Sequence, residues 1–90
     1  MNSIDLMTEQ QDFLTNLELA GKSFNTVKNY RTDLNCFNKF LASKQRKLIL
    51  NELSTTQVKE YCTHLEKTYG SSNSIRRRIQ ALRIFYDYLL

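Results

Sequence analysis

Apolar residues recur at helical spacing in four stretches of the chain, with polar residues between them. In the last stretch, five residues follow one another at steps of four, three, four and three: Ile75, Ile79, Leu82, Tyr86 and Leu89. This spacing places them on one face of an α-helix, which has about 3.6 residues per turn. The same pattern predicts helices over residues 8–20, 25–43, 54–68 and 72–90. Because no alternating strand pattern bounded by turn residues is present, we predict an all-α fold, a compact four-helix bundle.

Helix ends are indicated by capping residues. A serine or threonine followed three residues later by glutamine forms a capping box, and Thr8–Gln11 and Ser54–Gln57 have this form. Gly21 is a natural stop for the first helix, because glycine is favoured just after a helix end. Ser23 or Asn25 can cap the second helix.

Three connectors join the predicted helices. We expect Phe24, in the first, to be buried against the helix ends. The second connector, residues 44–53, is too apolar for a free linker and is predicted to pack across the helix ends. It also carries a small basic cluster: Lys44, Arg46 and Lys47. Such clusters are usually solvated, and a phosphate contact is the alternative. The third connector, Gly70–Ser72, breaks the chain and caps the last helix.

The composition and charge of the chain favour one small folded domain with a polyanionic partner. The chain has 90 residues, is 41% hydrophobic, and contains no proline and two glycines, which favours long helices over residues 1–90 as a single domain. Residues 1–20 carry four acids and no base, whereas residues 21–90 carry 13 bases and 5 acids. An acidic first helix followed by a basic remainder indicates that only part of the surface meets a polyanion.

Two predicted helices carry a polar face opposite their apolar stripe. On the last helix this face holds four residues, with Arg83 at its flank: Asn73, Arg76, Arg77 and Gln80. On the second helix it holds Asn25, Lys28, Asn29 and Thr32. Cationic and amide side chains suit a phosphate backbone, and amides can pair with adenine edges. The face of the second helix is also consistent with ordinary solvent-exposed residues.

No enzyme, metal or membrane signature is present in the sequence. There is no nucleophilic motif, glycine-rich phosphate loop or paired-carboxylate motif, and His64 stands alone. Cys36 and Cys62 lack metal-ligand spacing, so we expect two free thiols, with a disulfide as the alternative. We predict no cofactor. No apolar run could span a bilayer and no signal peptide is evident, so we expect a cytoplasmic chain without a membrane partner.

Four segments together resemble the core-binding domain of tyrosine recombinases, the family of phage integrases and Xer-type recombinases. Ser23–Leu34 is similar to the opening S-x-x-T-x-x-x-Y-x-x-x-L of that domain, and Phe37–Leu41 to the F-x-x-F-L that follows. Leu53–Tyr61 resembles I/L-T-x-x-x-V-x-x-Y. Ser74–Leu89 resembles the closing helix T-I-x-R-x-L-S-A-L-R-x-F-Y-x-Y-L, and the resemblance covers about residues 8–90.

The resemblance implies a SAM-like bundle that forms half of a clamp on double-stranded DNA, with the second and fourth helices facing adjacent grooves. Carried over by position, the contacting candidates are Asn25, Thr26 and Asn29 on the second helix and Ser74, Arg76, Arg77 and Gln80 on the fourth. Ser74 stands where threonine is common and Gln80 where a small serine is common, so base specificity does not transfer.

The family's catalytic residues belong to a separate C-terminal domain, so the resemblance implies a fragment without chemistry of its own. Its other partners would be recombinase protomers in the full-length assembly, and we expect the isolated domain to be monomeric. The chain stops at Leu90 in mid-pattern, as a fragment of a longer recombinase would. One alternative is a helical protein-interaction module that binds an acidic partner. The other is a helix-turn-helix regulator. This second alternative lacks support because no short turn precedes the cationic helix, unless Tyr69–Ser72 forms that turn.

Overall fold

The structure, a computed structural model, describes residues 3–70 and 73–90 and confirms the predicted four-helix, all-α fold. Its elements are α1 (Leu6–Leu19), α2 (Phe24–Ser43), the short 3-10 helix η1 (Leu50–Glu52), α3 (Thr55–Tyr69) and α4 (Asn73–Leu89). Each helix boundary lies within two residues of its predicted position.

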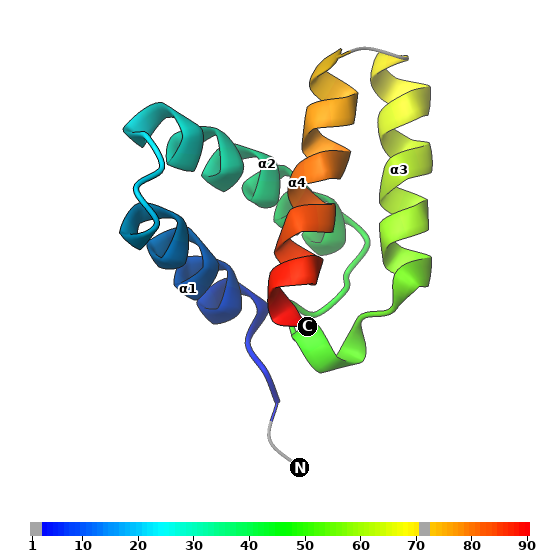
Figure 1. Cartoon of the computed structure of the whole chain (residues 1–90). Helices are drawn as coiled ribbons and strands as arrows, with labels where there is room; N and C mark the ends of the chain where they lie inside the picture. The colour runs from blue at the N-terminus through cyan, green and yellow to red at the C-terminus, as the bar shows by residue number, and fades with distance from the viewer. Residues whose placement is uncertain (1–2, 71–72) are drawn as a thin grey trace.

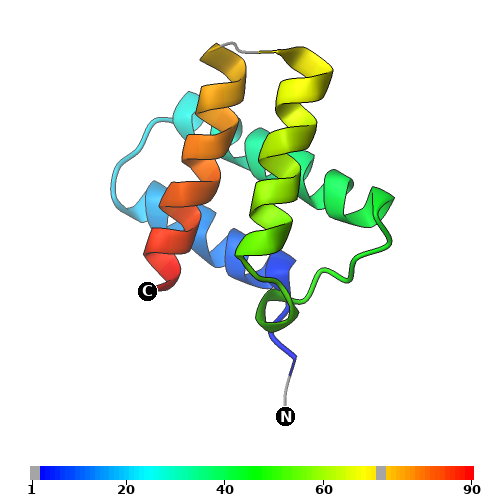
Figure 2. The same cartoon turned by 90° about the vertical axis from the view of Figure 1, so that its right-hand side faces the viewer.

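The helices form two pairs that cross each other. α3 and α4 lie side by side and run in opposite directions, and Figure 2 shows both in front of α1 and α2. α2 makes its most extensive contacts with α4, which also packs against α1 and α3 (Figure 1). α4 therefore packs against each of the other three α-helices.

Aromatic rings from all four helices meet in the core. The Phe13 and Phe85 ring centroids lie 5.5 Å apart, and those of Phe37 and Tyr61 lie 5.1 Å apart. The buried residues of α4 are Ile75, Ala81, Leu82 and Phe85. The stripe of α4 is thus wider than predicted, because the helix packs against neighbours on both sides. Tyr86, expected in the stripe, lies half-buried at its α3 edge.

The predicted cap of the first helix is wrong, because α1 begins two residues earlier. The Asp5 carboxylate accepts hydrogen bonds from the Thr8 backbone N (2.9 Å) and from Thr8 Oγ1 (2.7 Å). These bonds, the side-chain one first, lower the pKa of the Asp5 carboxyl. Thr8, which the capping-box pattern selected, therefore supports the cap from inside the helix.

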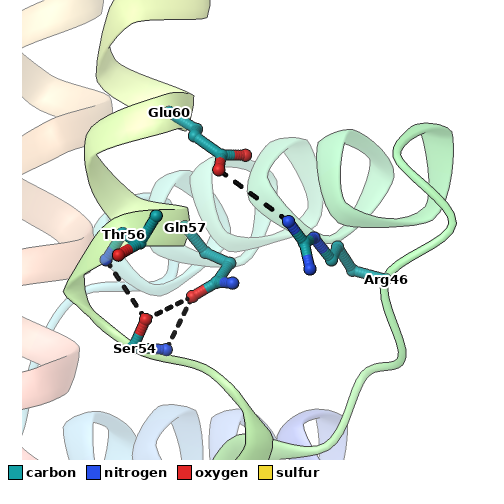
Figure 3. Close-up of polar contacts among 5 residues, drawn as sticks. All are labelled: Arg46, Ser54, Thr56, Gln57 and Glu60. Atoms are coloured by element: carbon teal, nitrogen blue, oxygen red, sulfur yellow. Dashed lines mark hydrogen bonds and ion pairs between the residues drawn. The ribbon is translucent and has the colours of Figure 1, made fainter.

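The capping box of α3 forms as predicted. Gln57 Oε1 accepts from the Ser54 backbone N at 2.7 Å, and Ser54 Oγ accepts from the Thr56 backbone N at 3.3 Å (Figure 3). Ser23 caps the start of α2, and Gly70, whose φ of 72° suits glycine, caps the C-terminal end of α3. Ser72, the predicted cap of the last helix, lies outside the described residues.

One connector between the helices differs from the sequence-based prediction, and another agrees with it. Phe24 is 81% exposed, so its predicted burial is wrong: it is the first residue of α2 and its side chain points to solvent. The apolar connector after α2 does pack across the helix ends. Its backbone is joined to the N-terminal segment by hydrogen bonds from Leu6 N to Leu48 O (3.0 Å) and from Leu50 N to Ile4 O (2.7 Å).

A buried amide pair joins α1 to α2. Gln10 and Asn38 exchange two side-chain hydrogen bonds of 2.9 and 2.7 Å, and both residues are buried. We expect Asn38→Ala to lower the free energy of unfolding by about 2 kcal/mol, because the Gln10 amide would be buried without a partner. Urea unfolding followed by circular dichroism measures this loss. Asn35→Ala, on the exposed side of the same helix, is the control, and equal stability of the two variants would contradict the prediction.

Candidate nucleic-acid interface

A groove between α2 and α4 brings together predicted residues from both helices. Its volume is about 230 Å³, and its lining residues are Thr26, Asn29, Tyr30, Asp33, Arg77, Gln80 and Ala81. Four of them, Thr26, Asn29, Arg77 and Gln80, were candidate DNA-contacting residues from the sequence. Positions about 50 residues apart in the chain thus share one small concave surface, because α2 packs along α4.

An ion pair that the sequence did not predict spans this groove. Arg77 Nη2 lies 3.2 Å from Asp33 Oδ1. The Asp33 side chain is only 2% exposed, whereas the Arg77 side chain is 50% exposed. A buried carboxylate needs a hydrogen-bonded cation. Arg77 is therefore tied to the fold through Asp33, and only its outer half faces solvent.

The amide side chains at the groove are free to meet a ligand. Asn29 and Gln80 are both exposed, and each amide carries a donor and an acceptor. Thr26 is half-buried, and its hydroxyl oxygen accepts a hydrogen bond from Ser23 Oγ at 2.9 Å. The groove thus presents two amides and the edge of one guanidinium group.

The remaining predicted residues of α4 lie outside the groove. Asn73, Ser74 and Arg76 are exposed at the first turn of the helix. Arg83 is exposed on the other flank, where it lines an apolar groove of about 440 Å³ between α3 and α4. Arg78, which the sequence did not select, lies with its guanidinium 5.2 Å from the centre of the Tyr69 ring.

The polar face predicted on α2 divides between two surfaces. Lys28 and Thr32 line a different hollow, of about 620 Å³, beside the end of α1. The Thr32 hydroxyl donates a hydrogen bond of 3.0 Å to the Lys28 backbone O, so it is already engaged within the helix. Asn25 is exposed in the first turn of α2 and lines neither surface. Only Thr26 and Asn29 among these residues face α4.

Cys36, Cys62 and Tyr61 lie outside the groove between α2 and α4. No group of three or more metal-ligating side chains occurs among residues 3–70 and 73–90. Cys36 and Cys62 are free thiols, as expected, and burial raises the pKa of Cys62. Tyr61 is 1% exposed, and its burial raises the pKa of the hydroxyl. Within the described ranges, none of the helices is long and apolar enough to cross a bilayer.

Comparison with known proteins agrees with the resemblance in the sequence motifs. Residues 11–90 match the family model described as "Phage integrase, N-terminal SAM-like domain". "Tyrosine recombinase XerC" of Staphylococcus aureus strain bovine RF122 / ET3-1 is 35% identical over 80 residues, which is 88% of this chain and 26% of that protein. The protein of the same name from strain MRSA252 has the same identity and coverage, and that from strain JH9 is 34% identical.

The chain spans about a quarter of the length of these relatives. No solved structure is significantly similar to it.

Proposed function

The chain belongs to the family of phage integrase N-terminal SAM-like domains, and from this membership we propose that it binds duplex DNA through α2 and α4. The groove that joins Asn29, Arg77 and Gln80 is the observation that carries the proposal. Arginine and amide side chains are the groups that recognise base edges and phosphates most often. A groove that presents both, on a chain of net charge +4, suits a nucleic acid.

The proposed contacts fall into two kinds. Arg76 and Arg83, both exposed on α4, would neutralise phosphates and supply affinity without sequence preference. Asn29 and Gln80 would reach base edges, since a bidentate amide pair fits adenine. Arg77 would act mainly by holding the groove in shape, because Asp33 already engages its guanidinium.

We propose that the domain is one half of a clamp whose other half, with the catalytic residues, lies in a separate domain. The relatives named tyrosine recombinase XerC are about four times longer than the matched segment. The parent would then be a cytoplasmic site-specific recombinase whose protomers assemble on DNA. The isolated domain would be monomeric and would bind with the ~10⁻⁴–10⁻⁶ M affinity of non-specific contacts.

An NMR titration of the labelled domain with a short duplex at low and high salt tests this function. We expect amide shifts at Asn25–Thr32 and Asn73–Arg83 that disappear at high salt. Absence of any shift at low salt would contradict the proposal. It would favour the alternative, a helical module whose arginines bind an acidic protein.

Asn29→Ala is expected to reduce discrimination between target and scrambled duplexes by about tenfold, because one amide pair with a base contributes about 1–3 kcal/mol. Affinity for the scrambled duplex should change little. Titration of each duplex, followed by fluorescence anisotropy, measures both values. Asn35→Ala is the matched control on the α1 side of α2. An equal loss of affinity for both duplexes would show that Asn29 does not recognise bases.

A further inference from the structure

A second basic surface lies beside α3. It is an open hollow of about 570 Å³ between the C-terminal end of α2 and α3. Its lining residues are Phe40, Lys44, Thr56, Lys59, Glu60, Thr63, His64 and Lys67. We call it the α3 hollow. It shares no residue with the groove between α2 and α4.

The charge of the α3 hollow is strongly positive because its one acid is already paired. Arg46 Nη2 lies 3.8 Å from Glu60 Oε1, and Figure 3 shows the guanidinium directed at that carboxylate. Three lysines remain without a counter-ion among the ion pairs of residues 3–70 and 73–90: Lys44, Lys59 and Lys67. By comparison, the groove between α2 and α4 holds one arginine, which Asp33 neutralises.

Ring contacts at the base of the α3 hollow hold the end of α2 in position. The rings of Phe40 and His64 lie 5.0 Å apart, and Lys44 Nζ lies 5.9 Å from the Phe40 ring centre. This stacking anchors the end of α2 against α3. Thr56 and Thr63 add hydroxyl groups between the lysines. The surface therefore offers several donors around one concave centre.

The chemistry of the lining favours a nucleic-acid backbone over a protein surface. Protein interfaces are enriched in aromatic residues, methionine and arginine at their centre and are depleted in lysine. The α3 hollow has the reverse composition, with lysines and hydroxyls at its rim and its one phenylalanine 6% exposed. Lysine is a flexible point charge suited to phosphate.

We propose that the α3 hollow binds phosphates of duplex DNA and is a second DNA-binding surface of this domain. This goes beyond the function proposed for α2 and α4. Lys59 stands at the edge of the hollow, since it also lines the groove between α3 and α4, whereas the other α3 residues of the hollow lie outside that groove. The hollow is formed with α3 and the groove with α4, the two helices that lie side by side in Figure 2, and the two surfaces would contact separate stretches of the DNA backbone.

The test is an NMR titration of the 90-residue chain with a short duplex of random sequence. We expect amide shifts at Lys59, Thr63 and Lys67. Three lysine contacts predict that the affinity obtained from these shifts falls about 40-fold between 50 and 200 mM salt. In Lys59→Gln/Lys67→Gln the same fall should be only about threefold to fourfold.

The matched control is Lys22→Gln/Lys39→Gln, which removes the same charge from exposed positions outside the hollow. It should keep the full salt dependence at α3. A control that behaves like the hollow variant would overturn the proposal, since net charge alone would then explain binding. Equal shifts at α3 with a polyglutamate peptide would also overturn it, because the surface would then accept any acidic chain.

The outcome for the two surfaces can be separated in the same spectra. Arg76→Gln/Arg83→Gln should weaken binding at α4 and leave the shifts of Thr63 and Lys67 on α3 unchanged. Shifts on α3 without shifts on α2 and α4 in the unmodified chain would contradict the proposed function and support this inference. Shifts on α2 and α4 without shifts on α3 would support the proposed function and contradict this inference.

Discussion

Replacing Arg77 by alanine is expected to lower the free energy of unfolding by about 3 kcal/mol. The reason is Asp33, whose carboxylate is 2% exposed and has Arg77 as its ion-pair partner at 3.2 Å. Removal of one member of a buried pair leaves an uncompensated charge, which typically costs about 3–5 kcal/mol. We take the lower end because the Arg77 side chain is 50% exposed, so water partly screens the pair. Urea unfolding followed by circular dichroism measures the change.

Two further variants make this prediction specific to the pair. Arg76→Ala removes an exposed arginine one position away and should change stability by less than about 0.5 kcal/mol. Asp33→Asn in the Arg77→Ala background removes the stranded charge and should restore part of the loss. If Arg76→Ala and Arg77→Ala destabilised the chain equally, or if Asp33→Asn restored nothing, the ion pair would not be the cause.

This pair also determines how binding data on the domain should be interpreted. A variant that removes Arg77 loses stability and a groove residue together, so weaker DNA binding would have two causes. Arg76 and Arg83 do not have this problem, because both are exposed and neither forms an ion pair within the ranges that the structure describes. Phosphate contacts on α4 should therefore be tested at these two positions.

The helices were predictable from sequence because local rules and tertiary packing agree. Each apolar stripe faces the core, and the Ser54–Gln57 box forms with both of its hydrogen bonds. Thr8–Gln11 has the same sequence form, but Asp5 lies three residues before Thr8 and is the stronger acceptor. The charged carboxylate binds both the backbone N and the hydroxyl of Thr8, and this moves the helix start.

The orientation of α4 was harder to predict from the sequence. A single apolar stripe describes a helix that packs against one neighbour. α4 has neighbours on both sides, so Phe85 and Ala81 are buried while Tyr86 moves to the α3 edge. This wider contact also divides the arginines. Arg77 faces α2, whereas Arg83 lies towards α3. Spacing within one helix cannot predict this division, because it depends on where the other helices pack.

Asp33 was missed although a signal was present. It lies three residues after Tyr30 and four before Phe37, so it occupies a position on the apolar stripe of α2. An acid at such a position predicts a buried charge that needs a basic partner. The sequence alone could not identify that partner, since four arginines occur between Ser74 and Arg83. Only the packing of α2 on α4 selects Arg77.

A large effect on DNA binding at α4 is expected from Arg76→Gln/Arg83→Gln. Each phosphate contact contributes about 0.9 to the slope of log affinity against log salt. Because this variant lacks two contacts, its affinity for the duplex at α4 should depend less on salt. Between 50 and 200 mM salt, the factor by which this affinity falls should be about twelve times smaller than in the unmodified chain. Amide shifts of Asn73 and Gln80 in NMR titrations with a short duplex give the affinity at this surface.

The control for this prediction is again Lys22→Gln/Lys39→Gln, which has the same net charge as the arginine variant. Its salt dependence at α4 should equal that of the unmodified chain, because lysines away from the contact act only through long-range attraction, which salt of this range screens within about 10 Å. The arginine variant should also unfold at the same urea concentration as the unmodified chain. If both double variants lost the same salt dependence, the arginines of α4 would not contact phosphate, and the polar face of this helix would be a solvated surface rather than a DNA-binding one.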